Sequence, residues 1–199
     1  VHDDFASIKR YVDYFQGLNI RNVICFAHSY PGFSQAIPPL FTQFQNVVFI
    51  DQPDTTLAVS NVASDVFAEV YGAVLHLAKR GCRRIILYLP HYRDPGNAER
   101  RRALVAAYRD AKLDYEPDFC YEGAIPEFND SLETIEAFFQ HALALKADAL
   151  ICPNDEFALQ TLAMIRAQNL NIRIFSSDRW STGQPFLPDF DGNLIDYEG

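Results

Sequence analysis

The chain has 199 residues, 49% of them hydrophobic and 22% charged, with 26 acidic against 17 basic side chains and a formal net charge of −9. Its 16 Phe and 10 Tyr exclude a disordered acidic tail, and its length suits one large or two small domains. The acidic balance opposes contact with phosphate, which disfavours this chain by itself as a nucleic-acid binder. No apolar run approaches the ~18 residues that a membrane helix needs, and residues 1–20 do not resemble a signal peptide.

Short apolar runs alternate with amphipathic stretches along the chain, which predicts strands alternating with helices. In chain order the expected elements are a helix over 3–16, strands over 23–27 and 47–50 with a short helix in the loop between them, a helix from 65 to 81, a strand over 85–89, helices over 97–112 and 130–142, a strand over 149–152, a helix over 156–168 and a strand over 172–175. The tail from Ser181 is expected to be irregular as far as Leu194. This alternation predicts an α/β fold, with parallel strands joined by right-handed crossovers.

Two local signals mark helix ends. Asp130 and Glu133 have the spacing of a capping box at the start of the helix over 130–142. Asp65 precedes the helix that Gly81 is expected to end, because glycine adopts the left-handed conformation common just after a helix.

Cysteine and histidine spacing gives no sign of a metal site or of disulfides. The four cysteines contain no C-x-x-C pair, and buried thiols in a reducing cytoplasm are the expected state. The five histidines form no pair at helical spacing, and neither a glycine-rich phosphate loop nor a nucleophile elbow occurs. No metal, no cofactor and no catalytic residue is therefore predicted.

Polar and aromatic side chains follow the ends of the predicted strands. They include Asp51, Arg93, Asn154, Asp155, Asp178 and Trp180. In open α/β sheets ligands bind outside the carboxyl ends of the strands, and this mixture of groups suits a polyhydroxylated ligand. Other interpretations stay open: Asp51 and Asp155 could only cap turns or helices, and Trp180 could belong to a small satellite core.

Five motifs in order resemble a known family. They are 47–51 (VVFID), a strand ending in Asp; 76–85 (HLAKRGCRRI), close to "HL…GHRRI" with Cys82 in place of His; 107–111 (AYRDA), close to "GYRDA"; 147–159 (ADALICPNDEFAL), close to "DAlicxNDxxAL"; and 176–178 (SSD), where the family has a Gly-aromatic-Asp turn. Over about residues 20–180 the chain thus resembles the effector-binding domain of lactose/galactose-repressor-type transcriptional regulators.

The resemblance implies a two-lobed, periplasmic-binding-protein-like fold with parallel sheets flanked by helices. Compared with that family the chain looks truncated at both ends, because one strand–helix–strand unit would precede it and further helices would follow Asp178. Residues 1–52 and 181–199 would form an incomplete amino-terminal lobe, and residues 53–180 the carboxy-terminal lobe. The DNA-binding headpiece would lie outside this chain.

The resemblance also implies roles for particular side chains. The expected ligand-binding residues are Asp51 and Asp178 for hydroxyl groups, Asn154 as donor and acceptor, Arg101 or Arg93 for adjacent oxygens, and Trp180 and Phe128 for stacking. The family's own arginine position falls on Leu104 here, so Arg101, one turn earlier, or Arg93 would replace it.

The function that follows is sensing of a small, sugar-like effector by a cytoplasmic bacterial transcriptional regulator. The partners would be a carbohydrate effector, operator DNA reached through the separate headpiece, and a second copy in a homodimer, with no membrane. The alternative is a periplasmic sugar-binding protein of a transporter, which shares the fold. A sugar-processing enzyme is a third possibility that the weak catalytic signals disfavour.

Overall fold

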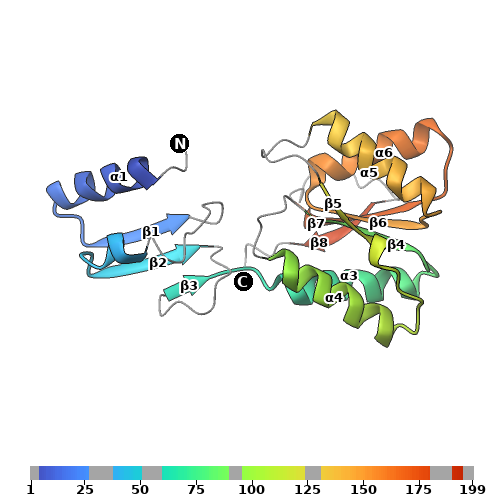
Figure 1. The fold of residues 1–199 in the computed structure, drawn as a ribbon, viewed down its shortest axis with the longest axis horizontal. Coiled ribbons are helices and arrows are strands. Elements are labelled where there is room, and N and C mark those ends of the chain that lie inside the picture. The colour runs from blue at the N-terminus through green and yellow to red at the C-terminus, as the bar shows by residue number, and fades with distance from the viewer. Residues whose placement is uncertain are drawn as a thin grey trace. The chain divides into compact units, whose positions relative to one another are not determined.

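The computed structural model describes residues 5–26, 38–50, 60–89, 96–123, 131–179 and 190–194. Its elements form two compact units: the helices and strands up to residue 65 belong to the first, and those from the helix that starts at Val66 belong to the second (Figure 1). No helix in the described part is long and apolar enough to cross a membrane.

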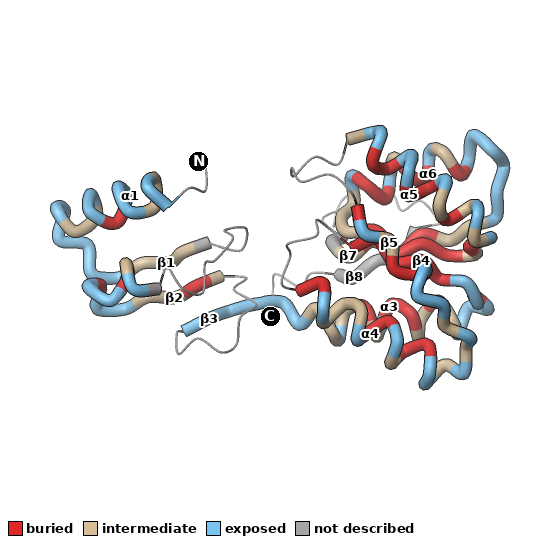
Figure 2. Tube along the Cα trace, viewed as in Figure 1, coloured by how far each residue is buried: buried red, intermediate tan, exposed pale blue. Residues whose placement is uncertain are grey.

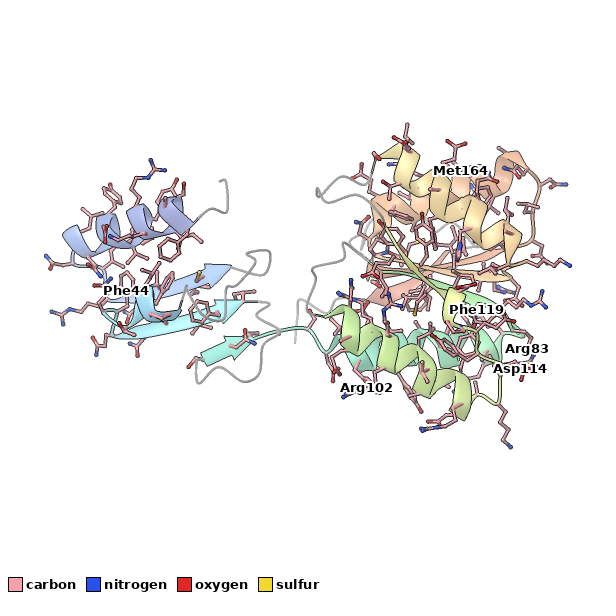
Figure 3. The ribbon with its side chains drawn as sticks, in the orientation of Figure 1. Phe44, Arg83, Arg102, Asp114, Phe119 and Met164 are labelled. Carbon is pink, nitrogen blue, oxygen red and sulfur yellow. The ribbon has the colours of Figure 1, made fainter. Side chains whose placement is uncertain are left out.

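The first unit is a small parallel sheet with a helix against one face. Its elements are α1 (Phe5–Gly17), β1 (Asn22–Phe26), η1 (Pro38–Phe41), β2 (Asn46–Ile50) and β3 (Ser60–Val62), with strand order β1-β2-β3. Val12 of α1 packs with three phenylalanines, Phe41, Phe44 and Phe49, of which Phe44 is labelled in Figure 3. Because Ile8, Val12 and Phe15 share one side of α1, a single helical stripe covers this core.

The second unit is a five-stranded parallel sheet between two layers of helices. Its elements are α3 (Val66–Lys79), β4 (Ile85–Leu89), α4 (Asn97–Asp110), η2 (Pro117–Phe119), β5 (Cys120–Glu122), α5 (Leu132–Ala144), β6 (Ala149–Cys152), α6 (Asp155–Ala167), β7 (Arg173–Arg179) and β8 (Phe190–Leu194). The strand order is β5-β4-β6-β7-β8, with α3 and α4 on one face and α5 and α6 on the other (Figure 1). Every residue of β4 and β6 is buried (Figure 2), so the predicted α/β class with parallel sheets flanked by helices is confirmed.

The structure confirms one predicted helix end and differs from another. Helix α3 begins directly after Asp65, and Gly81 has the left-handed φ of +94° expected beyond its end. The start of α5 differs from the prediction, because its N-cap is Ser131 and not Asp130. The Ser131 hydroxyl accepts the N–H of Thr134 at 3.3 Å. The predicted capping box therefore placed the N-cap one residue too early in the chain. Asp130 itself lies outside the described residues.

Three short strands and one strand end were not predicted. Strands β3, β5 and β8 are short or rich in polar residues, and β7 runs on to Arg179 instead of stopping at 175. Their hydrogen-bond partners are supplied by neighbouring strands, so the local sequence carries little signal for them.

These strands alter the expected division of the chain. Residues 60–62 were assigned to the second lobe, but β3 pairs in parallel with β2 of the first unit. Residues 190–194 were assigned to the first lobe, but β8 pairs in parallel with β7 at the edge of the second unit's sheet. In both cases backbone pairing, which the sequence pattern does not encode, decides which unit the segment joins.

Tyr108 of α4 substitutes for a missing strand partner. Pairing between β4 and β5 begins only at Leu87, so Ile85 has no neighbouring strand on that side. The buried Tyr108 hydroxyl accepts the Ile85 N–H at 2.7 Å and donates to the Ile85 carbonyl at 2.8 Å. Burial raises the pKa of this phenol well above its ordinary value, which keeps it protonated and able to donate.

Asp148 joins the two loops that precede the central strands. Its carboxylate accepts the backbone N–H groups of Arg83 at 2.7 Å and of Arg84 at 2.9 Å. The Arg84 carbonyl in turn accepts the N–H of Asp148 at 3.0 Å. The aspartate in the motif over 147–159 therefore fixes where β4 starts relative to β6.

We expect Tyr108→Phe to lower the free energy of unfolding by about 1–3 kcal/mol, because it leaves the buried N–H and carbonyl of Ile85 without a partner. Urea denaturation measures the difference, with Tyr14→Phe as the control, since Tyr14 is an exposed tyrosine on α1. Equal stability of the two variants would contradict this role of the hydroxyl.

Candidate functional site

Polar side chains gather where the strands of the second unit's sheet end and helices α4, α5 and α6 begin. In a parallel α/β sheet these points lie on one edge, the carboxyl edge, where ligands characteristically bind. Among the described side chains there are Arg101, Glu122, Asn154, Asp155 and Ser176. They form two groups, one at β5 and one between β6 and β7.

The first group is an ion pair between α4 and the end of β5. The Arg101 Nη2 atom lies 2.8 Å from Glu122 Oε2, and both side chains are about two-fifths exposed, at 41% and 39%. An exposed pair of this kind contributes only about 0–1 kcal/mol to stability. Its main consequence is therefore geometric: one amino group of Arg101 lies against the Glu122 carboxylate at the carboxyl edge.

Cys120 lies two residues before Glu122 on β5, on the same side of the strand. Burial raises the pKa of its thiol, and the positive charge of Arg101 opposes that rise without overcoming it. Burial also raises the pKa of the neighbouring Tyr115 phenol to about 12. Both groups are thus neutral near pH 7, and Glu122 is the anion that faces Arg101 here.

The second group starts helix α6. The Asn154 side-chain oxygen accepts the Phe157 N–H at 2.8 Å, which makes Asn154 the N-cap of the helix. The buried Ser176 of β7 donates its hydroxyl to the Asp155 carboxylate at 2.6 Å. The cap that the sequence analysis considered for Asp155 is thus formed by Asn154, while Asp155 connects α6 to β7.

Aromatic rings pack behind this edge on the α5 and α6 face of the sheet. The rings of Tyr88 and Phe157 have centroids 4.5 Å apart, and the Tyr88 and Tyr121 rings stack at 6.0 Å. A Cβ atom at Gly123 would lie 2.7 Å from the Tyr88 hydroxyl oxygen, so the Tyr88 ring packs directly against Gly123 where β5 ends. The sequence analysis missed these residues, because an apolar strand run does not reveal which of its rings reach the end of the strand.

The remaining predicted site residues have different outcomes. Asp178 lies within β7, not in a turn beyond it, at an irregularity in the pairing with β8 between Ser176 and Arg179. The strand continues because β8 supplies partners on its outer side. Asp51, Arg93, Phe128 and Trp180 lie outside the described residues.

The cysteines and the metal-binding residue types have the following states in the described part of the chain. All four cysteines are thiols, with Cys82, Cys120 and Cys152 buried and Cys25 half-buried. No cluster of three His, Cys, Asp or Glu side chains with a geometry for a metal ion occurs among the described residues.

Comparison with known proteins identifies the family. The sequence model of the periplasmic binding protein-like domain family matches residues 74–173, half of the chain, so the chain belongs to this family. The matched region runs from α3 to the first residue of β7 and contains Arg101, Glu122, Asn154 and Asp155. No sequence among the curated proteins matches the chain.

Solved structures share the fold at low sequence identity. A LacI-family regulatory protein from Chloroflexus aggregans is similar with a TM-score of 0.79 and 20% identity, over 96% of this chain and 69% of that one. A PurR-family transcriptional regulator from Vibrio parahaemolyticus gives 0.78 and 17%, over 98% and 73%. The transcriptional regulator CelR, solved with cellobiose, gives 0.65 and 19%, over 86% and 53%. The periplasmic-binding-protein-like fold predicted from the motifs is confirmed.

We expect Asn154→Ala to lower the free energy of unfolding by about 0.5–2 kcal/mol, because it removes the α6 cap. Asn154→Ser should keep most of the stability of the unaltered chain, because serine also caps helices well. Urea denaturation of both variants measures this. If the alanine and serine variants were equally destabilised, the cap would not be what Asn154 contributes to stability.

Proposed function

We propose that this chain is the effector-sensing part of a bacterial transcriptional regulator. It binds a small molecule of carbohydrate type and controls, allosterically, the DNA binding of a separate headpiece. The observation that carries the proposal is the pairing of Arg101 with Glu122 at the carboxyl edge of a sheet whose fold is shared with solved LacI-type regulators. An oriented guanidinium beside a carboxylate offers both donors and acceptors to vicinal hydroxyl groups.

The polar groups at this edge favour an uncharged, hydroxyl-bearing effector. Glu122 neutralises Arg101, and the start of α6 is already occupied by its Asn154 cap and by the acidic Asp155 and Glu156. A carboxylate or phosphate on the ligand would be repelled by Glu122, Asp155 and Glu156, whereas sugar hydroxyls could donate to these anions and accept from Arg101. CelR, which shares the fold, was solved with a sugar, and that supports the class of ligand.

The other predicted ligand residues belong to the same proposal. Asp178 on β7 would accept hydroxyl donors, with Asp51 in the same role, and Arg93 is the alternative to Arg101. Phe128 and Trp180 would stack on the apolar face of a sugar ring. Cys120 and Tyr115 lie behind Arg101 and would position it without contacting the ligand.

The regulatory consequence follows from differential affinity. An effector changes DNA binding only to the extent that it binds one state of the regulator more tightly than the other. We propose that the intact protein acts in the cytoplasm as a homodimer, so that two headpieces can meet a two-fold operator. The acidic chain would supply sensing and symmetry, and a basic module outside it would supply affinity for DNA.

A periplasmic sugar-binding protein is the competing function. The solved structures reported above are transcriptional regulators, and the HLAKRGCRRI string is that of regulators, so both favour the regulator. The intact gene separates the two directly: a helix-turn-helix within about 60 residues before the sensing domain supports the regulator, and a secretory leader there would overturn it.

We expect Asp178→Ala to weaken effector binding about 5- to 150-fold, the loss of one charged hydrogen bond, while the fold survives. Mass spectrometry of small molecules retained after mild purification identifies the effector, and calorimetry then measures its affinity. Asp13→Ala is the control, because Asp13 is exposed on α1, where it pairs with Lys9. Unchanged affinity in the Asp178 variant would remove this residue from the site.

We also expect residues 1–199 alone to show negligible DNA binding at physiological salt, whereas the full-length protein binds a pseudo-palindromic site as a dimer and responds to the effector. Electrophoretic mobility shifts and analytical ultracentrifugation measure both properties. Tight operator binding by residues 1–199, or a strictly monomeric full-length protein, would contradict the proposed function.

A further inference from the structure

Basic side chains of this acidic chain concentrate at the end of the second unit opposite the candidate ligand site, where the strands begin and the helices end. Of the 17 Lys and Arg residues, nine lie there: Lys79, Arg80, Arg83, Arg84, Arg109, Lys112, Lys146, Arg166 and Arg173. Figure 3 labels Arg83 at this end of the unit. A chain with a net charge of −9 thus carries a local positive surface.

Helix ends account for six of these nine residues. Lys79 and Arg80 end α3, Arg109 and Lys112 end α4, and Lys146 and Arg166 end α5 and α6. Cations there compensate the negative end of the helix dipole, so they need no further explanation. Arg83, Arg84 and Arg173 stand at the beginnings of β4 and β7 and have no helix end to compensate.

The backbones of these three arginines meet at Asp148. Arg83 and Arg84 donate their backbone N–H groups to its carboxylate, and Arg173 donates its N–H to the Asp148 carbonyl at 3.0 Å. The carboxylate is thus engaged by two backbone donors. No ion pair within the described residues involves the guanidinium of Arg83, Arg84 or Arg173, and the side chains of Arg83 and Arg84 are exposed.

The size of the cluster limits what it can bind. The three arginines span β4, β6 and β7, which at the usual spacing of strands is about 10 Å. On the β5 side the exposed Asp114, Glu116 and Asp118 bound it with negative charge. A nucleic acid would extend its phosphates far beyond this width, across an acidic protein, whereas two or three carboxylates of a short peptide match it.

We infer that Arg83, Arg84 and Arg173 form a docking surface for a short acidic segment, rich in Asp or Glu, of a partner protein. Guanidinium groups bind carboxylates in a bidentate manner, and three of them on one exposed edge can engage several carboxylates at once. This surface lies at the opposite end of the strands from the candidate ligand site, so the inference does not depend on the proposed effector.

The test is binding of a fluorescein-labelled hexaglutamate peptide to the 199-residue chain at low salt, followed by anisotropy. The combined variant Arg83→Gln, Arg84→Gln, Arg173→Gln should weaken binding about ten-fold or more. The control is Lys9→Gln, Arg10→Gln, Arg21→Gln, which removes three positive charges from the first unit and should weaken binding less than about three-fold. The backbone donors to Asp148 persist in all variants, and circular dichroism checks that each is folded.

Three results would overturn the docking surface. They are no peptide binding by the unaltered chain at low salt, an equal loss in the two triple variants, or tighter binding of a labelled ten-nucleotide oligothymidylate than of the peptide. If the triple variant does not fold, Arg83→Gln alone is compared with Arg10→Gln. A loss of peptide affinity in Arg83→Gln without a similar loss in Arg10→Gln supports the docking surface, and equal affinities in the two variants contradict it.

Discussion

The burial of β4 and β6 on both faces is the constraint on which the second unit depends. Helices cover both sides of these strands, so their backbone polar groups have no access to water and each needs a partner in the protein. Neighbouring strands supply most of these partners. Where a strand falls short, side chains replace it: the Tyr108 hydroxyl for Ile85 and the Asp148 carboxylate for the loops before β4 and β6.

The parallel arrangement also separates the chemistry of the two ends of the sheet. In the second unit the N-termini of the described α-helices α4, α5 and α6, with the polar groups Asn154, Asp155 and Glu122, belong to the end where the strands finish. The C-termini of α3 to α6, with nine of the 17 basic residues of the chain nearby, belong to the end where the strands begin. The proposed ligand site and the proposed docking surface thus lie at opposite ends of the same strands, with the same core between them.

Structural and functional demands coincide at the candidate ligand site. Asn154 caps α6, Asp155 holds β7 through Ser176, and Glu122 orients Arg101, so each polar residue already has a bond within the protein. Groups held in this way lose little conformational freedom when a ligand arrives. The Tyr88 ring packs against Gly123 at the end of β5 and against Phe157 of α6, so it lies in contact with both strand and helix of this site.

The sequence by itself determined the α/β class, the helices over α3, α4 and α6, the buried strands β4 and β6 and, through its motifs, the family. These elements carry their signal locally, as continuous apolar runs or as helical spacing with Gly81 beyond the end. Only the tertiary structure decided that β3 joins the first unit, that β8 joins the second and that Asp178 lies inside a strand. It also revealed Glu122 as the partner of Arg101 and Asp148 as the point where three arginines meet. The physical reason is the same throughout. Hydrophobic periodicity depends on residues that are close together in the sequence, so it can be detected there. Strand pairing and ion pairs join residues that are far apart in the sequence, and the sequence pattern does not show which of them will be in contact.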